Sequence, residues 1–167
     1  MNFKICSCLI TIASIFFLPL KPASAQLLEE RPRKDLRCTD KEVLANLELM
    51  TTTRTYGGYQ TMGLWSEALS SEEILRRRYP MEGGILYVAI VTAPKGINAL
   101  ALEIRNSYGE KIEYVTQFNE LDNHLINHFF TPPDDDIYVL SVRVINRKSA
   151  RTCVGLALMK GEDDPTQ

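Results

Sequence analysis

Residues 83–105 read Gly-Gly-Ile-Leu-Tyr-Val-Ala-Ile-Val-Thr-Ala-Pro-Lys-Gly-Ile-Asn-Ala-Leu-Ala-Leu-Glu-Ile-Arg, and this stretch decides the class of fold. From Ile85 to Val91 the side chains of both parities are apolar. Such a strand is usually central and covered on both sides, and its β-branched content favours a strand over a buried helix. The glycines before this run and Pro94-Lys95-Gly96 after it are typical of the turns that bound a strand.

Residues 99–105 alternate in a different way. Leu100, Leu102 and Ile104 share one face, whereas Glu103 and Arg105 lie on the other. This pattern predicts a half-buried strand. We interpret the whole stretch as two neighbouring strands joined at a turn, so the rest of the chain must supply a second layer.

The N-terminus has the features of a secretory signal. Lys4 precedes an apolar run from Ile5 to Leu20, and Ala23-Ser24-Ala25 supplies the small residues of a cleavage site. A membrane anchor is the alternative, but the run is shorter than the roughly 20 residues that a spanning helix needs. We therefore expect cleavage after residue 25 and export to the periplasm or the medium, with no transmembrane segment afterwards.

Cleavage would leave residues 26–167, the size of one domain. Loss of Lys4 and Lys21 would leave 17 basic residues against 21 acidic ones, a net charge of about −4. This balance gives no electrostatic reason to expect nucleic acid as a partner. We divide the chain into a signal peptide (1–25), a flexible lead-in (26–37), a single domain (38–160) and a polar tail (161–167).

The expected mature chain keeps two cysteines, Cys38 and Cys153. In an exported protein the simplest interpretation is one disulfide. The bond would close a loop of 115 residues, for which the chain-entropy model gives about 4–5 kcal/mol. A redox or metal-binding thiol pair is the alternative, but the sequence has no Cys-x-x-Cys motif.

A helix signature follows Cys38. Thr39 and Glu42 have the spacing of a capping box, and Asp40 is favourable in the first turn. The run Thr51-Thr52-Thr53 should end the helix, since β-branched residues weaken it. The apolar face of this helix should consist of Val43, Leu44, Leu47 and Met50.

Alternation and turn signals predict the remaining strands. One assignment is ambiguous, because Ser70 and Glu73 also mimic a helical capping box; we choose a strand over 74–79. Between residues 111 and 118 we place Ile112, Tyr114 and Phe118 on one face, and between 137 and 145 we expect alternate residues from Tyr138 to Val144 to face inward. The predicted strands outside the deciding stretch are residues 60–68, 74–79, 111–118, 125–131, 137–145 and 153–159.

Two groups of residues suggest a site for a metal ion. His124 and His128 are the only histidines, but in a strand they would lie roughly 13 Å apart, too far for one metal. Asp134, Asp135 and Asp136 offer hard oxygen ligands for Ca²⁺, although their spacing does not match an EF-hand loop. An acidic surface turn is the commoner outcome, so we predict no metal and keep Ca²⁺ as an alternative.

Other residues suggest recognition instead of chemistry. Tyr56 and Tyr59 flank Gly57-Gly58, which is either a binding loop or a turn packed on the core. Arg76-Arg77-Arg78 is either a site for an anion or acidic partner or an edge strand guarded by charge. The sequence lacks Gly-x-Ser-x-Gly, Walker and Gly-x-Gly-x-x-Gly motifs, so we assign no catalytic residue and do not expect an enzyme.

Several short motifs resemble the bacterial pre-peptidase C-terminal type of β-sandwich. They are Met81 to Val88, Leu100 to Ile104, the turn at Gly109, Phe130-Thr131-Pro132-Pro133 and Ile137 to Leu140. The family often has Asp-Leu-Asp in its second strand, where this chain has Ala99 to Glu103, which puts calcium coordination there in doubt. Members of the family are usually modules attached to secreted enzymes. This chain has no room for an enzyme, so the resemblance implies a free-standing relative.

Taken together, these observations predict a mainly β protein: an antiparallel β-sandwich, jelly-roll-like, with one N-terminal α-helix. We expect a non-enzymatic exported interaction or accessory module with a protein or glycan partner. A calcium-, glycan- or small-ligand-binding sandwich that uses Asp134–Asp136 or the loop at Tyr56 and Tyr59 is the alternative.

Overall fold

The computed structural model describes residues 33–118, 124–145 and 151–162. The predicted signal peptide, most of the lead-in and most of the tail lie outside these residues. The elements are β1 (Arg33–Leu36), α1 (Lys41–Tyr56), β2 (Tyr59–Leu69), β3 (Ile74–Met81), β4 (Tyr87–Thr92), β5 (Ala99–Arg105), β6 (Lys111–Phe118), β7 (Leu125–Phe130), β8 (Asp136–Ile145) and β9 (Thr152–Gly161).

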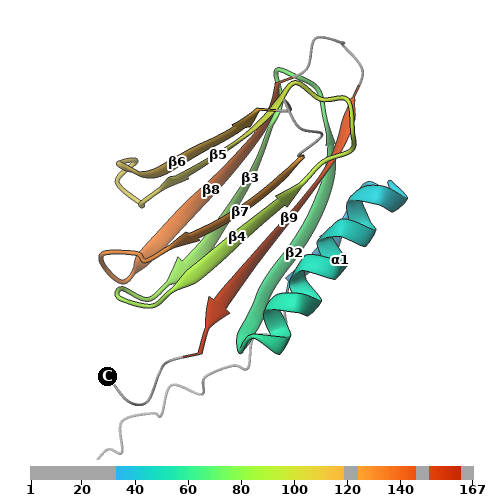
Figure 1. Cartoon of the computed structure of the whole chain (residues 1–167). Helices are drawn as coiled ribbons and strands as arrows, with labels where there is room; N and C mark the ends of the chain where they lie inside the picture. The colour runs from blue at the N-terminus through green and yellow to red at the C-terminus, as the bar shows by residue number, and fades with distance from the viewer. Residues whose placement is uncertain (1–32, 119–123, 146–150, 163–167) are drawn as a thin grey trace, which may run out of the picture.

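The strands form two packed sheets, and α1 makes a third layer on one of them (Figure 1). The five-stranded sheet has the order β1-β2-β9-β4-β7 and the four-stranded sheet has the order β3-β8-β5-β6. β2, β3, β4 and β5 pair antiparallel with β9, β8, β7 and β6 respectively. This nested pairing is a jelly roll, so the predicted sandwich and its single N-terminal helix are confirmed.

The deciding stretch contains two strands, as predicted, but they are not neighbours. β4 pairs with β7 and β9, whereas β5 pairs with β6 and β8 in the opposite sheet. Residues 93–98 therefore cross from one sheet to the other. The patterns of the two strands reflect this separation: Tyr87, Ala89 and Val91 of β4 face the core, and Val88 and Ile90 lie under α1.

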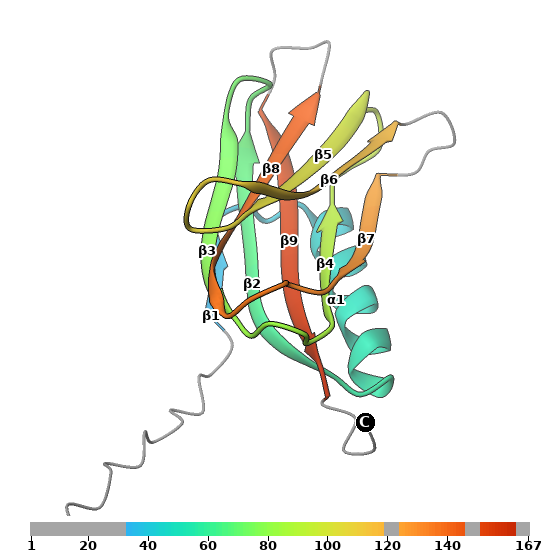
Figure 2. The same cartoon turned by 90° about the vertical axis from the view of Figure 1, so that its left-hand side faces the viewer.

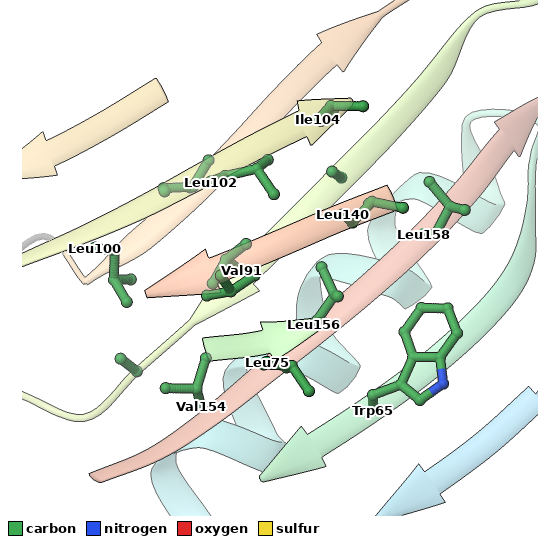
Figure 3. Packing of buried hydrophobic residues seen from close by; sticks show 14 of the residues in the cluster. Trp65, Leu75, Val91, Leu100, Leu102, Ile104, Leu140, Val154, Leu156 and Leu158 are labelled. Carbon is green, nitrogen blue, oxygen red and sulfur yellow. The ribbon is translucent and has the colours of Figure 1, made fainter. Parts of the chain in front are cut away.

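The main core fills the space between the two sheets (Figure 3). Leu100, Leu102 and Ile104 of β5 pack there, as the alternation predicted. Polar ends of buried rings are satisfied: the Tyr79 hydroxyl donates to the Met62 carbonyl oxygen at 3.0 Å. The predicted inward side of β8 is also confirmed, since its alternate residues are fully buried: Tyr138, Leu140, Val142 and Val144.

Helix α1 begins and ends differently from the prediction. Its N-cap is Asp40, not Thr39: the Asp40 carboxylate accepts from the backbone N–H groups of Glu42 and Val43 at 3.0 and 3.1 Å. The threonine run does not end the helix, which continues to Tyr56. The Thr51 and Thr53 hydroxyls donate to carbonyl oxygens four residues back, and helical backbone geometry accommodates these bonds.

Several contacts hold α1 against the five-stranded sheet. The predicted disulfide is present: Cys38 before the helix is bonded to Cys153 on β9, with 5.8 Å between their Cα atoms. The Ser66 hydroxyl donates to the Cys38 carbonyl oxygen at 2.9 Å, and the Thr92 hydroxyl donates to that of Val43 at 3.2 Å. Gly155 of β9 lies under the helix, where an added Cβ would be 2.6 Å from Thr92 Oγ1.

Three further predictions need correction. Arg33–Leu36 is not flexible lead-in but β1, which pairs parallel with β2. Gly161 belongs to β9, not to a polar tail, and donates its N–H to the Leu86 carbonyl oxygen at 2.8 Å. Ile112 does not share a face with Tyr114 and Phe118: a β-bulge in the β5–β6 pairing turns Ile112 toward the core, while Tyr114 and Phe118 stay exposed.

Candidate binding surface

The outer faces of the two sheets differ in what covers them. On the five-stranded sheet, α1 packs over Val88, Ile90, Ala157 and Met159, which are fully buried. No element of the described chain packs over the outer face of the four-stranded sheet, which lies on the side away from α1 (Figures 1 and 2). We name this surface the open face; its residues are Ile74, Arg76, Arg78, Pro80, Ala99, Ala101, Glu103, Arg105, Lys111, Tyr114, Thr116, Phe118, Ile137, Val139, Ser141, Arg143 and Ile145.

Strand register brings the basic residues of the open face together from four strands. Arg76 of β3 lies opposite Ser141, which lies opposite Glu103 of β5. The basic residues of this surface are Arg76, Arg78, Arg105, Lys111 and Arg143, and its carboxylate is Glu103. The open face is thus cationic although the whole chain has a net charge of −2.

The Glu103 carboxylate already has a hydrogen-bonding partner on its own strand. Arg105 Nε donates to Glu103 Oε1 at 2.7 Å, and Arg105 Nη2 donates to Oε2 at 3.2 Å. The hydrogen bonds from Arg105, helped by the charges of Arg105, Arg143 and Lys111, lower the pKa of Glu103. The same pair raises the pKa of Arg105. Within the described chain, Arg76, Arg78 and Arg143 have no carboxylate within ion-pair distance.

A groove of about 300 Å³ runs across the centre of this surface. Its floor consists of Ala101 and Ser141, which are small and only 4% and 8% exposed. Longer side chains stand around this floor, so the surface is hollow there. The groove is lined by Ala101, Glu103, Lys111, Tyr114, Ser141 and Arg143.

Exposed apolar side chains border the basic groove. Tyr114 is 56% exposed and its ring lies 5.6 Å from Lys111 Nζ, within cation–π range. Phe118 and Ile145 lie on either side of Ala99, because both are paired with it in the sheet. Phe118 is 62% exposed and Ile145 is 45% exposed. A surface with aromatic, aliphatic and arginine side chains has the composition of a protein-binding patch.

The aspartates of the predicted acidic turn form hydrogen bonds within the molecule. Asp135 Oδ1 accepts the N–H of Gly83 at 2.7 Å, and Asp136 Oδ2 accepts the N–H of Ser107 at 2.9 Å. The bond from Ser107 lowers the pKa of Asp136. Asp134 contributes its carbonyl oxygen to the Tyr138 hydroxyl at 2.9 Å. These residues join the loops at one end of the sandwich, so two of the three candidate calcium ligands have backbone partners.

The predicted tyrosine loop is a turn between α1 and β2. Tyr56 is the last helical residue and is 90% exposed, while Gly58 has a φ of 84°. Tyr59 is half-buried, with its ring 6.0 Å from that of Phe129. The structure therefore places Tyr56 and Tyr59 at a helix end and does not bring them together with the aspartates into one pocket.

The two histidines have separate partners. His124 Nε2 lies 3.7 Å from Glu42 of α1, and His128 Nε2 lies 3.3 Å from Glu113 of β6. Among residues 33–118, 124–145 and 151–162, no three histidine, cysteine or acidic side chains are grouped closely enough to hold a metal ion.

The arginine run is divided between two environments. β3 is an edge strand, as expected, and Arg76 and Arg78 point outward on the open face. Arg77 points the other way and lies 3.3 Å from Glu67 of β2. The sequence alone missed Arg143, Lys111 and Tyr114, because each stands in a separate strand and only the register brings them together. Their one sequence signal was alternation: it predicted that Arg143 faces outward, but it placed Tyr114 on one face with Ile112, which the structure turns toward the core.

No protein-family model matches the chain, and no curated protein matches it in sequence. Among solved structures, the chain is similar to Aeromonas hydrophila PliG, a periplasmic lysozyme inhibitor of g-type lysozyme. The two are 10% identical, the match covers 78% of this chain and 97% of that chain, and the TM-score is 0.43. No helix in the described residues has the length and apolar composition needed to cross a bilayer. The likeness to the pre-peptidase C-terminal sandwich remains a resemblance.

Proposed function

We propose that this chain is an exported, non-enzymatic module that binds a partner protein through the open face. The observation that carries the proposal is the contrast between two outer faces of one sandwich. One is apolar and covered by α1, and the other is open, grooved and basic. A basic, aromatic surface that no described element of the chain covers is best explained by a partner.

The chemistry of the open face supports binding over catalysis. Its charged groups are arginine and lysine side chains, which are hydrogen-bond donors only, and one carboxylate held by Arg105. General acid–base catalysis needs a group that exchanges protons near the working pH. The Cys38–Cys153 disulfide supports export, since such bonds persist in oxidising compartments.

Site-specific crosslinking tests the proposal. A photoreactive benzoylphenylalanine replaces Thr116 on the open face or, as a matched control, Ala45 on the exposed side of α1. The labelled chains are irradiated in an extract of the cells that export the protein. We expect a protein adduct from position 116 and none from position 45.

Competition makes the result specific. Excess unlabelled wild-type chain should suppress the adduct, whereas a chain with Arg78→Glu and Arg143→Glu should not. Equal adducts from both positions, equal competition by both chains, or no adduct at position 116 would each overturn the proposal. A melting temperature close to that of wild type shows that the charge-reversed chain is folded.

A further inference from the structure

The groove on the open face has the size and charge of a side-chain subsite. A volume of about 300 Å³ is at the lower limit for ligand pockets and accommodates one or two side chains. Arg143 and Lys111 both line it. Glu103 is held by both donors of Arg105, and no carboxylate of the described chain lies within ion-pair distance of Arg143.

We propose that this groove receives a carboxylate side chain from an extended acidic segment of the partner, an inference that rests on the proposed function. Arginine presents a planar fork of donors that matches a carboxylate, and such charge-assisted bonds are the strongest in proteins. The small floor made by Ala101 and Ser141 lets a carboxylate approach Arg143 from outside the sheet.

The register of the sheet gives the spacing of the segment. Residues on one face of a strand recur every second position, about 7 Å apart. The first row of the open face is Phe118, Ala99 and Ile145, and the next row contains Thr116, Ala101 and Arg143. The third row contains Glu103 and Arg76, with Glu103 held by Arg105, and the fourth contains Lys111, Arg105 and Arg78. An extended segment with an apolar residue followed by acidic residues at every second position matches this order.

The apolar row favours a protein over an acidic polysaccharide. Phe118 and Ile145 are exposed and offer no hydrogen bonds to sugar hydroxyl groups. An apolar side chain of a protein segment would bury them, and removing apolar surface from water favours binding. A polyanion without apolar groups would leave this row in water.

Fluorescence anisotropy tests the inference on the folded, disulfide-bonded chain. The probe is a fluorescein-labelled peptide, Gly-Leu-Ser-Asp-Ser-Glu-Ser-Glu-Gly, and its control has Asn and Gln in place of the acidic residues. We expect the acidic peptide to bind and the amide peptide to bind at least about tenfold more weakly. Raising NaCl from about 50 to about 300 mM should weaken the acidic peptide, because salt screens exposed charges.

Variants locate the peptide on the surface. Arg143→Gln should weaken binding about tenfold and Phe118→Ser severalfold. Lys41→Gln, which removes one exposed charge at the start of α1, should leave it unchanged. Alginate, an acidic polysaccharide, is the competing probe, and Phe118→Ser separates the two sources of carboxylate, since only a protein segment should depend on the apolar row.

Each other outcome has a definite meaning. Equal binding of the two peptides, no binding of either, or no effect of Arg143→Gln would overturn the inference. Tighter binding of alginate, insensitive to Phe118→Ser, would also overturn it in favour of an acidic glycan. The adduct at position 116 is measured independently, so the inference can fail while the proposed function stands.

Discussion

The two outer faces of the sandwich are made by strands of similar length, but one face is covered by a helix and the other is open. At the centre of the five-stranded sheet the outward residues are Val88, Ile90, Ala157 and Met159, and α1 buries all four completely. On the four-stranded sheet the outward residues are arginine, lysine and aromatic side chains over a floor of Ala101 and Ser141. In this fold the outward residues of the strands, not their backbones, determine which sheet is covered by the helix and which stays open.

The disulfide gives the largest expected effect, and it lies on the covered side. Replacing both Cys38 and Cys153 by Ser should lower the free energy of unfolding by about 4 kcal/mol, since the bond closes a loop of 115 residues. Urea unfolding of the two chains measures the loss. An unchanged midpoint would show that helix packing alone holds the covered face together.

The second prediction compares a helix contact with an open-face residue. Leu47→Ala should cost about 3 kcal/mol, because Leu47 is buried between α1 and the sheet. Tyr114→Ala should change the free energy of unfolding by less than about 0.5 kcal/mol, since its ring is exposed. Equal losses in urea unfolding would mean that the open face is as structural as the covered one.

The third prediction compares the loss of stability when one methyl group is added to each face. Gly155→Ala should cost about 2 kcal/mol, because the new Cβ would lie 2.6 Å from Thr92 Oγ1 and 3.2 Å from Leu47 Cδ2. Ser141→Thr adds a methyl group to the open groove and should stay within about 0.5 kcal/mol. Hydrogen exchange should show faster exchange in α1 for the Gly155 variant alone; protection unchanged in α1 would contradict this explanation.

The smallest effect concerns pH and the loops at the end of the sandwich. The pKa of Asp136 is lowered in the folded state, so its carboxylate stabilises the fold above the unfolded pKa near 3.9. This contribution is lost as pH falls through the lower folded pKa. Asp136→Asn should therefore reduce the melting temperature slightly at pH 7, and the difference from wild type should disappear in strong acid. A difference that is the same at both pH values would rule out the carboxylate as its cause.

Local sequence patterns predicted much of the fold. Alternation in residues 99–105 and 137–145 identified the buried sides of β5 and β8, because strand geometry has a fixed period of two. The pairing of Cys38 with Cys153 followed from the cysteine count. The double-sided apolar pattern of residues 85–91 identified a central strand, and the structure shows that its two covers are the other sheet and α1.

The rest of the fold depends on the long-range register of the strands, which no local sequence pattern contains. β4 and β5 were predicted to pair because they are adjacent in sequence, but β4 pairs with β7 and β9, and β5 pairs with β8 as well as with the next strand, β6. A single bulge after Ile104 turned Ile112 inward, which no alternation rule anticipates. The open face combines residues from four strands, so its charge became visible only when their order was known.

The nested strand pairing also sets the order of events during synthesis. β9 lies between β2 and β4, and its residues Thr152 and Gly161 are opposite Leu69 and Tyr59. The five-stranded sheet cannot assemble until the last strand has left the ribosome, whereas the β5–β6 hairpin can form from the middle of the chain. Pairings this distant in sequence slow folding. The five-stranded sheet therefore stays incomplete until synthesis reaches β9, whereas all four strands of the other sheet are available by Ile145.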